Sequence, residues 1–234
     1  MKKTISVLGC VLLAFVIFVP LGTVACLYCG WKFELTSAAG FYLAGAILAL
    51  GVLILSLLAH PVHSVPVTCI YAVTALLSIV GLLFAALFYC HTPLAVVFAA
   101  LITLCCIGLA IMHTASRAFR ITSIVISVGL MVPVSYLTFI MALFGNIGCR
   151  TVVQTAMSPD GAYCAELIDD DQGACGGNTE VEVKKTSYFD GMFFRVTEPP
   201  RTVYHGQWGE FKDMTIRWKD DRCLLINEKE YPIE

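Results

Sequence analysis

Four long stretches of this sequence contain no Asp, Glu, Lys or Arg, and a fifth apolar stretch precedes them. In chain order the five stretches are residues 5–27, 38–58, 67–89, 93–112 and 121–145. A helix needs roughly 20 apolar residues to cross the hydrocarbon core of a bilayer. The stretches lack the alternation of apolar and polar residues that marks the strands of a membrane barrel. Because backbone groups in lipid must be satisfied internally, we expect five transmembrane helices.

Charge is distributed unevenly along the chain. Only 14% of the residues are charged, whereas an ordinary soluble domain has about 25%. From Arg150 onward the chain holds 16 of its 17 acidic residues and 10 of its 15 basic ones, a net charge of −6. The sequence therefore predicts an α+β membrane protein, with a transmembrane helical domain over residues 1–149 and a small antiparallel β domain over residues 150–234. An acidic domain lacks the clustered basic residues that nucleic acid binding requires.

The starts of two helices can be read from residues that commonly cap helices. Ser37 precedes the second apolar stretch, and a serine at this position can accept a hydrogen bond from the first turn. Thr92 and Pro93 precede the fourth stretch, and proline is favoured at the first helical position. We therefore expect helices to begin directly after Ser37 and Thr92.

The orientation in the membrane follows from basic residues near the ends of the stretches. With five spans, one face carries Lys2, Lys3, Arg117 and Arg120, and the other carries Lys32 and Arg150. Basic residues are retained in the cytoplasm, so we expect a multi-pass cell-membrane protein with a cytoplasmic N-terminus and an extracytoplasmic β domain. Aromatic side chains favour the membrane interface, and several gather at the expected outer ends: Tyr28, Trp31, Phe33, Phe88 and Tyr89.

The first apolar stretch has a second interpretation. Two lysines followed by an apolar run also resemble a secretory signal. Thr23-Val24-Ala25-Cys26 resembles a bacterial lipoprotein cleavage box, although Thr23 stands where that box prefers leucine. We expect a retained helix, with cleavage and lipidation at Cys26 as the alternative. Cys26 lies on the outer side in both cases.

The C-terminal part has the pattern of short antiparallel strands. Ser158-Pro159-Asp160-Gly161 separates two expected strands, and each residue suits one position of a tight turn. Val181 and Val183 alternate with Glu180, Glu182 and Lys184, which indicates a strand with one wet face. The expected strands cover residues 151–157, 162–168, 179–185, 201–206, 214–219, 223–227 and 231–233.

The same residues carry a resemblance to other proteins. The Ser158–Gly161 turn is followed by Cys175-Gly176-Gly177-Asn178-Thr179 and then by Trp218-Lys219-Asp220-Asp221. Over residues 150–228 this pattern resembles the β domain of small bacterial membrane-anchored proteins of unknown function. The turn and later tryptophan are also similar to one blade of a TolB-type β-propeller, but a single copy cannot close a propeller. The resemblance implies no activity and no catalytic residues.

Two sets of cysteines could carry chemistry. Cys26 and Cys29 form a C-x-x-C pair at the outer end of the first stretch, and this spacing lets one thiolate attack and its partner resolve a mixed disulfide. In the β domain, an oxidising compartment would allow one structural disulfide among four candidates, whose pairing the sequence leaves open: Cys149, Cys164, Cys175 and Cys223.

No cofactor or metal ion is expected. Asp169, Asp171 and Glu180 match three positions of a calcium-binding loop, but Ala174 stands where that loop needs glycine. His113 we expect at the membrane interface. The apolar stretches contain hydroxyl groups but no acid or base, and coupled transport commonly needs such a group inside the membrane.

We therefore expect a protein without enzymatic activity. Its partners are the lipid bilayer and a protein or small ligand bound by the β domain, so that it acts in binding, sensing or assembly. One alternative is a membrane thiol–disulfide oxidoreductase that uses Cys26 and Cys29. A further alternative is a transporter of a small neutral solute, which would need a polar cavity between the helices.

Overall fold

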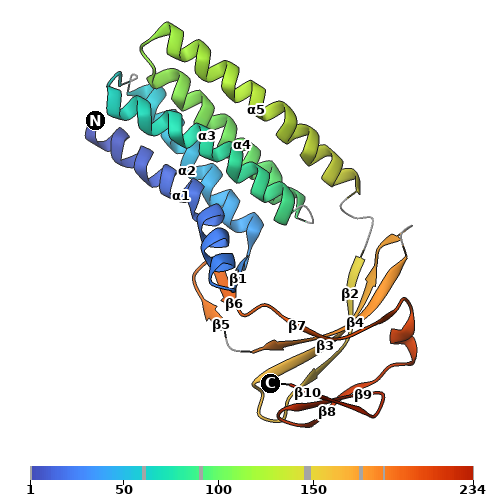
Figure 1. The fold of residues 1–234 in the computed structure, drawn as a ribbon. Helices are drawn as coiled ribbons and strands as arrows, with labels where there is room; N and C mark the ends of the chain where they lie inside the picture. Colours follow the sequence, from blue (N-terminus) through green and yellow to red (C-terminus); the bar gives the residue numbers. More distant parts are fainter. Residues whose placement is uncertain are drawn as a thin grey trace. The chain divides into compact units, whose positions relative to one another are not determined.

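A computed structural model describes residues 2–59, 62–89, 92–144, 149–173, 176–186 and 188–233. The described residues form two compact units (Figure 1). The helical unit lies within residues 1–25 and 35–145, and the β unit lies within residues 26–34 and 146–234. The β unit thus includes the segment that follows the first helix.

The described residues contain five helices that are long and apolar enough to cross a membrane, as the sequence predicts. They are α1 (Lys2–Tyr28), α2 (Ala38–Leu58), α3 (Val65–Phe88), α4 (Pro93–His113) and α5 (Arg117–Phe144). The α+β fold class is confirmed, because a small antiparallel β region follows these helices.

Capping residues explain where the helices begin and end. Ser37 Oγ accepts a hydrogen bond from the backbone N–H of Gly40 at 3.2 Å, so this predicted cap is confirmed. Thr92 precedes α4 and Pro93 occupies its first turn, although no side-chain bond from Thr92 caps this helix. At the end of α1, Gly30 has a φ of 73°, the left-handed conformation that terminates many helices.

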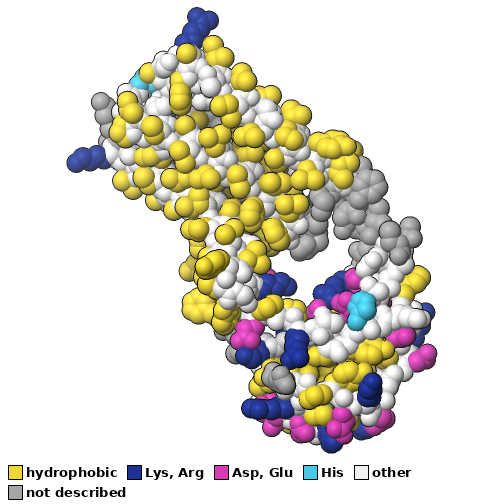
Figure 2. All heavy atoms as spheres, in the orientation of Figure 1, with side chains coloured by type: hydrophobic (Ala, Val, Ile, Leu, Met, Phe, Trp, Pro, Cys, Tyr) yellow, Lys and Arg dark blue, Asp and Glu magenta, His cyan; other side chains and the backbone are white. Residues whose placement is uncertain are grey.

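Small residues bring the helices of the bundle together. Gly45 of α2 lies against the ring of Phe15 in α1 and against Ile102 in α4, and Ala49 one turn later is fully buried. Gly51 on the same helix faces open space. Large apolar side chains such as Ile47 point outward instead, and Figure 2 shows them covering the visible face of this unit. This arrangement is typical of helices that pack closely inside lipid.

The described residues of the β unit form three sheets. Its strands are β1 (Lys32–Leu35), β2 (Cys149–Met157), β3 (Tyr163–Asp171), β4 (Gly177–Lys185), β5 (Tyr188–Asp190), β6 (Phe194–Thr197), β7 (Arg201–Gln207), β8 (Ile216–Asp220), β9 (Cys223–Ile226) and β10 (Lys229–Pro232). One sheet has the order β2-β3-β4-β7, the second β10-β9-β8 and the third β1-β6-β5. A short 3-10 helix, η2 (Glu210–Asp213), connects β7 to β8.

The predicted turn between the first two strands of this domain is confirmed. It joins β2 to β3, and Gly161 has a φ of 71° and donates its N–H to Ser158 O at 2.9 Å. Ser158 is buried, and its Oγ donates to Asp160 Oδ1 at 2.6 Å. The hydrophobic core lies between one face of the four-stranded sheet and β8–β10, with Leu167, Val181 and Leu224 at its centre.

Three strands were not expected from the sequence. β1 lies between the first two helices, yet it pairs with β6, which follows α5 in the chain. The ring of Phe33 on β1 stacks on that of Phe194 on β6, with centroids 5.4 Å apart. These strands have three or four residues each, too few for alternation to show, and the long-range pairing adds β1 to the local β5–β6 hairpin.

Candidate functional site

One face of the four-stranded sheet is polar because of the alternation along β3 and β4. Ala165, Leu167, Val181 and Val183 point into the core and are almost completely buried. Residues between them, such as Glu166, must then point to the opposite face because successive strand side chains alternate. The wet face predicted for residues 179–185 is therefore confirmed.

Three partly buried carboxylates lie close together on this face. Glu166 and Glu182 are opposite each other in the register of β3 and β4, and Glu180 is two residues from Glu182 along β4. Like charges opposite each other destabilise a sheet. Arg150 on β2 offsets this repulsion, because its guanidinium contacts Glu180 and lies 2.9 Å from Glu182 Oε1. Lys184 neutralises Glu166 in the same way.

These residues form the floor of a groove of about 500 Å³, which we call the charged groove. It is lined by Lys32, Glu34, Arg150, Val152, Met157, Cys164, Glu166, Ile168, Glu182, Lys184, Lys185, Thr186, Arg195, Thr197, Glu198 and Pro200. Lys32 and Glu34 come from β1, which pairs with β6, so the third sheet supplies one wall. The groove thus depends on contacts between segments far apart in the sequence.

Ion pairs continue along the rim of the groove. Lys32 Nζ lies 2.7 Å from Glu34 Oε1, and Lys185 Nζ lies 2.8 Å from Glu198 Oε1. The hydrogen bond with Glu198 raises the pKa of Lys185. The groove is therefore lined by five basic and four acidic side chains. Exposed ion pairs of this kind contribute only about 0–1 kcal/mol each, so a charged ligand could exchange them at little cost.

The described residues contain no group of three or more His, Cys, Asp or Glu side chains that could hold a metal ion. The three residues of the calcium-like pattern are not brought together. Glu180 contacts Arg150 and His205, whereas Asp171 Oδ1 accepts the backbone N–H of Gly173 at 2.8 Å. Asp169 pairs in register with Thr179, on the opposite face of β3 from the groove.

The structure describes two of the four disulfide candidates in full. Cys164, on β3 in the groove wall, and Cys223, on β9, both have free thiols. Burial raises the pKa of the Cys164 thiol, so this residue is a poor nucleophile. Cys175 and the side chain of Cys149 lie outside the described residues. Cys149 is opposite Asp171 in register, and Asp171 is seven residues from Cys164 along β3. The backbone positions of Cys149 and Cys164 are therefore about 23 Å apart.

Cys26 and Cys29 lie at the C-terminal end of α1, and both thiols are free. Cys26 O accepts the backbone N–H of Trp31 at 2.7 Å as part of the helix cap. The carbonyls at this end of a helix carry partial negative charge, whereas reactive C-x-x-C cysteines use the positive N-terminal end. The position of the pair thus gives no support to the oxidoreductase alternative.

His113 is the last residue of α4, and its ring is fully buried in the bundle. Nδ1 lies 3.1 Å from the backbone nitrogen of Val62 and 3.2 Å from its carbonyl oxygen, and Nε2 lies 3.2 Å from Ser56 Oγ. The ring stacks on Tyr71, whose hydroxyl donates to Ile5 O at 2.9 Å. This network joins four helices at one end of the bundle, and a lone histidine in the sequence offers no signal for it.

Two cavities among the described helices are lined mainly by apolar side chains, whereas a third, of about 410 Å³, has His63, Ser64, Thr68, Thr114 and Ser116 in its lining. One of about 20 Å³ lies beside Phe15 and Tyr42, and one of about 220 Å³ lies between α5 and the α3–α4 pair. Some buried hydroxyls bond to backbone carbonyls of the bundle: Thr103 Oγ1 donates to Ser78 O at 3.0 Å. These features give no support to the transporter alternative.

We compared the chain with protein-family models, with curated proteins and with solved structures, and none of these comparisons gave a significant match. The resemblance of residues 150–228 to small membrane-anchored proteins therefore stays a prediction. The charged groove is the candidate site because it is the feature of the β unit in which charge, partial burial and concave shape coincide.

Proposed function

We propose that this membrane protein is a binding module without enzymatic activity, and that its β domain lies outside the cytoplasm. In this proposal the charged groove binds a segment of a protein partner that carries both acidic and basic side chains. The set of ion pairs among the residues that line the groove is the observation that carries the proposal. An apolar ligand would have to desolvate these charges, whereas a charged peptide can replace their partners.

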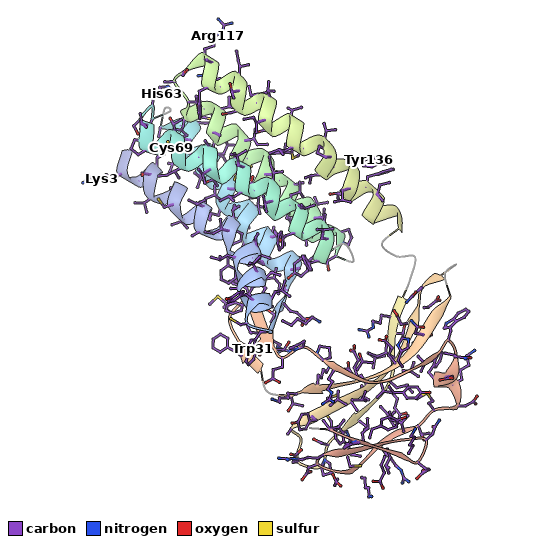
Figure 3. The ribbon with its side chains drawn as sticks, in the orientation of Figure 1. Lys3, Trp31, His63, Cys69, Arg117 and Tyr136 are labelled. Carbon is purple, nitrogen blue, oxygen red and sulfur yellow. The ribbon has the colours of Figure 1, made fainter. Side chains whose placement is uncertain are left out.

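Two features support the proposed topology. Lys3 and Arg117 lie at the same end of the bundle, as Figure 3 shows, and basic residues are retained on the cytoplasmic side. The pairing of β1 with β6 requires the α1–α2 connection and the C-terminal domain to share one side of the membrane. In a chain with an odd number of spans, an even number of spans separates the α1–α2 connection from the C-terminal domain, so the two lie on the same side.

Thiol labelling of intact cells tests the side of the membrane. We expect a membrane-impermeant maleimide to label an Arg222→Cys variant in intact cells, because Arg222 lies on the exposed β8–β9 turn. The matched control, Ala115→Cys, lies between α4 and α5 and should react only after permeabilisation. Peptide mapping separates these sites from native thiols, and the reverse labelling pattern would overturn the topology.

Site-specific crosslinking in native membranes tests the binding role. A photoreactive amino acid at Val152, an exposed residue in the groove wall, should form an adduct with a partner protein. Charge reversal by Arg150→Glu with Lys184→Glu should abolish this adduct. The control, Arg217→Glu with Lys219→Glu, reverses two exposed ion pairs outside the groove and should leave the adduct unchanged. An adduct that persists after groove reversal, or no protein adduct in the unreversed chain, would disprove the proposal.

A further inference from the structure

Exposed apolar side chains gather in the β unit beside the end of the first spanning helix. Tyr28, the last residue of α1, is 93% exposed. The hairpin formed by β5 and β6 exposes Phe189 by 64% and Met192 by 85%, and Phe193 is also exposed. Contiguous exposed apolar side chains mark an interaction surface on a protein. We propose that this hairpin tip, Phe189–Phe193, inserts into the headgroup interface of the bilayer next to α1.

The cap of α1 holds the start of β1 at the membrane surface. Gly30 donates its N–H to Leu27 O at 3.1 Å, and Trp31 donates to Cys26 O at 2.7 Å, so the chain turns immediately after the helix. β1 then begins at Lys32, four residues after Tyr28, which is a reach of at most about 14 Å. Trp31, labelled in Figure 3 where α1 meets β1, is a residue type that favours this interface.

Ring contacts attach the hairpin to this anchored strand. β6 is the direct neighbour of β1 in the third sheet. Phe194 on β6 stacks on Phe33 of β1, and its centroid lies 6.0 Å from that of Phe189 on β5. Because β1 cannot leave the end of α1, the hairpin is held at the height of the interface.

The Asp190 and Arg195 charges of the hairpin are paired, and a hydrogen bond closes its turn. Asp190 and Arg195 are opposite each other in register, and the guanidinium donates to both carboxylate oxygens, at 2.8 and 3.2 Å. Gly191 donates its N–H to Phe194 O at 2.8 Å, which closes the turn. A preformed turn with an aromatic and a methionine side chain outward can enter the interface without losing further conformational freedom.

The proximity of the bilayer favours lipid over the other occupants of this surface. A second copy or a partner protein would have to approach a hairpin whose sheet begins four residues after the end of α1. Lipid needs no such approach, because it surrounds the end of α1. The proposal is independent of the charged groove, and it holds whichever side of the membrane the β unit occupies.

Photocrosslinking of the purified chain in phosphatidylcholine nanodiscs tests the proposal. A photoreactive amino acid at Met192 should form adducts with the mass of the lipid. The matched control places it at Arg222, on a turn with Asp220 and Asp221 that cannot enter the interface without desolvating charge, and should form no lipid adduct above background. Both positions are exposed, so neither substitution disturbs the core.

Three other outcomes are informative. A reporter at Met192 that forms no lipid adduct would overturn the proposal. A reporter that instead yields a crosslinked dimer would assign the tip to contact between copies of this chain. Equal lipid adducts at Met192 and Arg222 would show that the contact is unspecific, and would also overturn it. Met192→Asp with Phe193→Asp should abolish lipid adducts from a reporter at Phe189.

Discussion

The helical bundle and the β domain expose opposite kinds of side chain. In the bundle, Ile47 and Leu58 point outward, while Gly45, Ala49 and Ser56 are buried. In the β domain, Leu167 and Leu224 are buried and the surface carries ion pairs (Figure 2). This difference shows that the solvent around each unit decides which interaction stabilises it. Burial of apolar surface stabilises the β core, whereas close packing and internal hydrogen bonds hold helices together in lipid.

Truncation of the β core should have the largest effect. Leu224 is fully buried among the side chains of both sheets, so Leu224→Ala should reduce the free energy of unfolding of the β domain by about 2–5 kcal/mol. The control is Leu225→Ala on the same strand, whose side chain is only partly buried. Thermal unfolding of the whole protein, monitored by the protease resistance of the β domain, measures the stability loss of each variant. Equal losses would contradict the assignment of the core.

A charge on the outer face of the bundle tests the comparison most directly. Ile47 is 65% exposed near the middle of α2, and Ile47→Asp should raise the free energy of membrane insertion by about 2.5–3.5 kcal/mol. Val153 on β2 is also exposed, but it lies in the β domain. Val153→Asp should change stability by less than about 1 kcal/mol. The yield of membrane-inserted protein measures both changes, and tolerance of Ile47→Asp would show that α2 does not face lipid.

Substitution of two glycines on the same helix tests close helix packing. A side chain at Gly45 would collide with the Phe15 ring and come within 2.9 Å of Ile102, whereas a side chain at Gly51 would meet nothing within 4 Å. Gly45→Val should therefore destabilise the bundle by about 1–3 kcal/mol. Gly51→Val, on the same helix, should have little effect. Thermal denaturation in detergent compares the two, and identical midpoints would be the contrary result.

The smallest expected change in stability comes from Asp160, in the turn between β2 and β3. Hydrogen bonds from Ser158 Oγ and from the Ala162 N–H lower the pKa of Asp160. A lowered pKa in the folded state stabilises the fold above the unfolded value of about 3.9, and this stabilisation is lost as pH falls through the folded value. The melting temperature of the wild type should therefore exceed that of Asp160→Asn at pH 7, and the gap should close below about pH 4. If the difference in melting temperature did not change with pH, the ionised Asp160 carboxylate would not be its cause.

The elements that the sequence predicts well are those with a local cause. The helix over Ala38–Leu58 has the predicted boundaries, because Ser37 caps it and the apolar run ends with it. The strands on either side of Ser158–Gly161 follow from the turn. The polar face of β4 follows from its alternation, so Glu180, Glu182 and Lys184 could be placed before the structure was known.

The rest could not be predicted, because it depends on contacts between distant segments. No local pattern shows that Lys32 and Arg150 reach the same groove. The burial of His113 depends on Ser56, Tyr71 and Val62, which come from other parts of the chain. The short strand β1 exists only because β6, from a distant part of the chain, pairs with it.

The sequence alone therefore determined the solvent of each region, because the free energy of transfer from water to lipid depends on composition summed over about 20 residues. It also determined the turns, whose conformations depend on single residues such as Gly161. Only the tertiary structure decided which strands pair, where the ion pairs of Arg150 and Lys184 meet, and that the Phe189–Phe193 hairpin joins β1. Pairing between distant strands depends on the packing of the whole unit, which no local pattern contains.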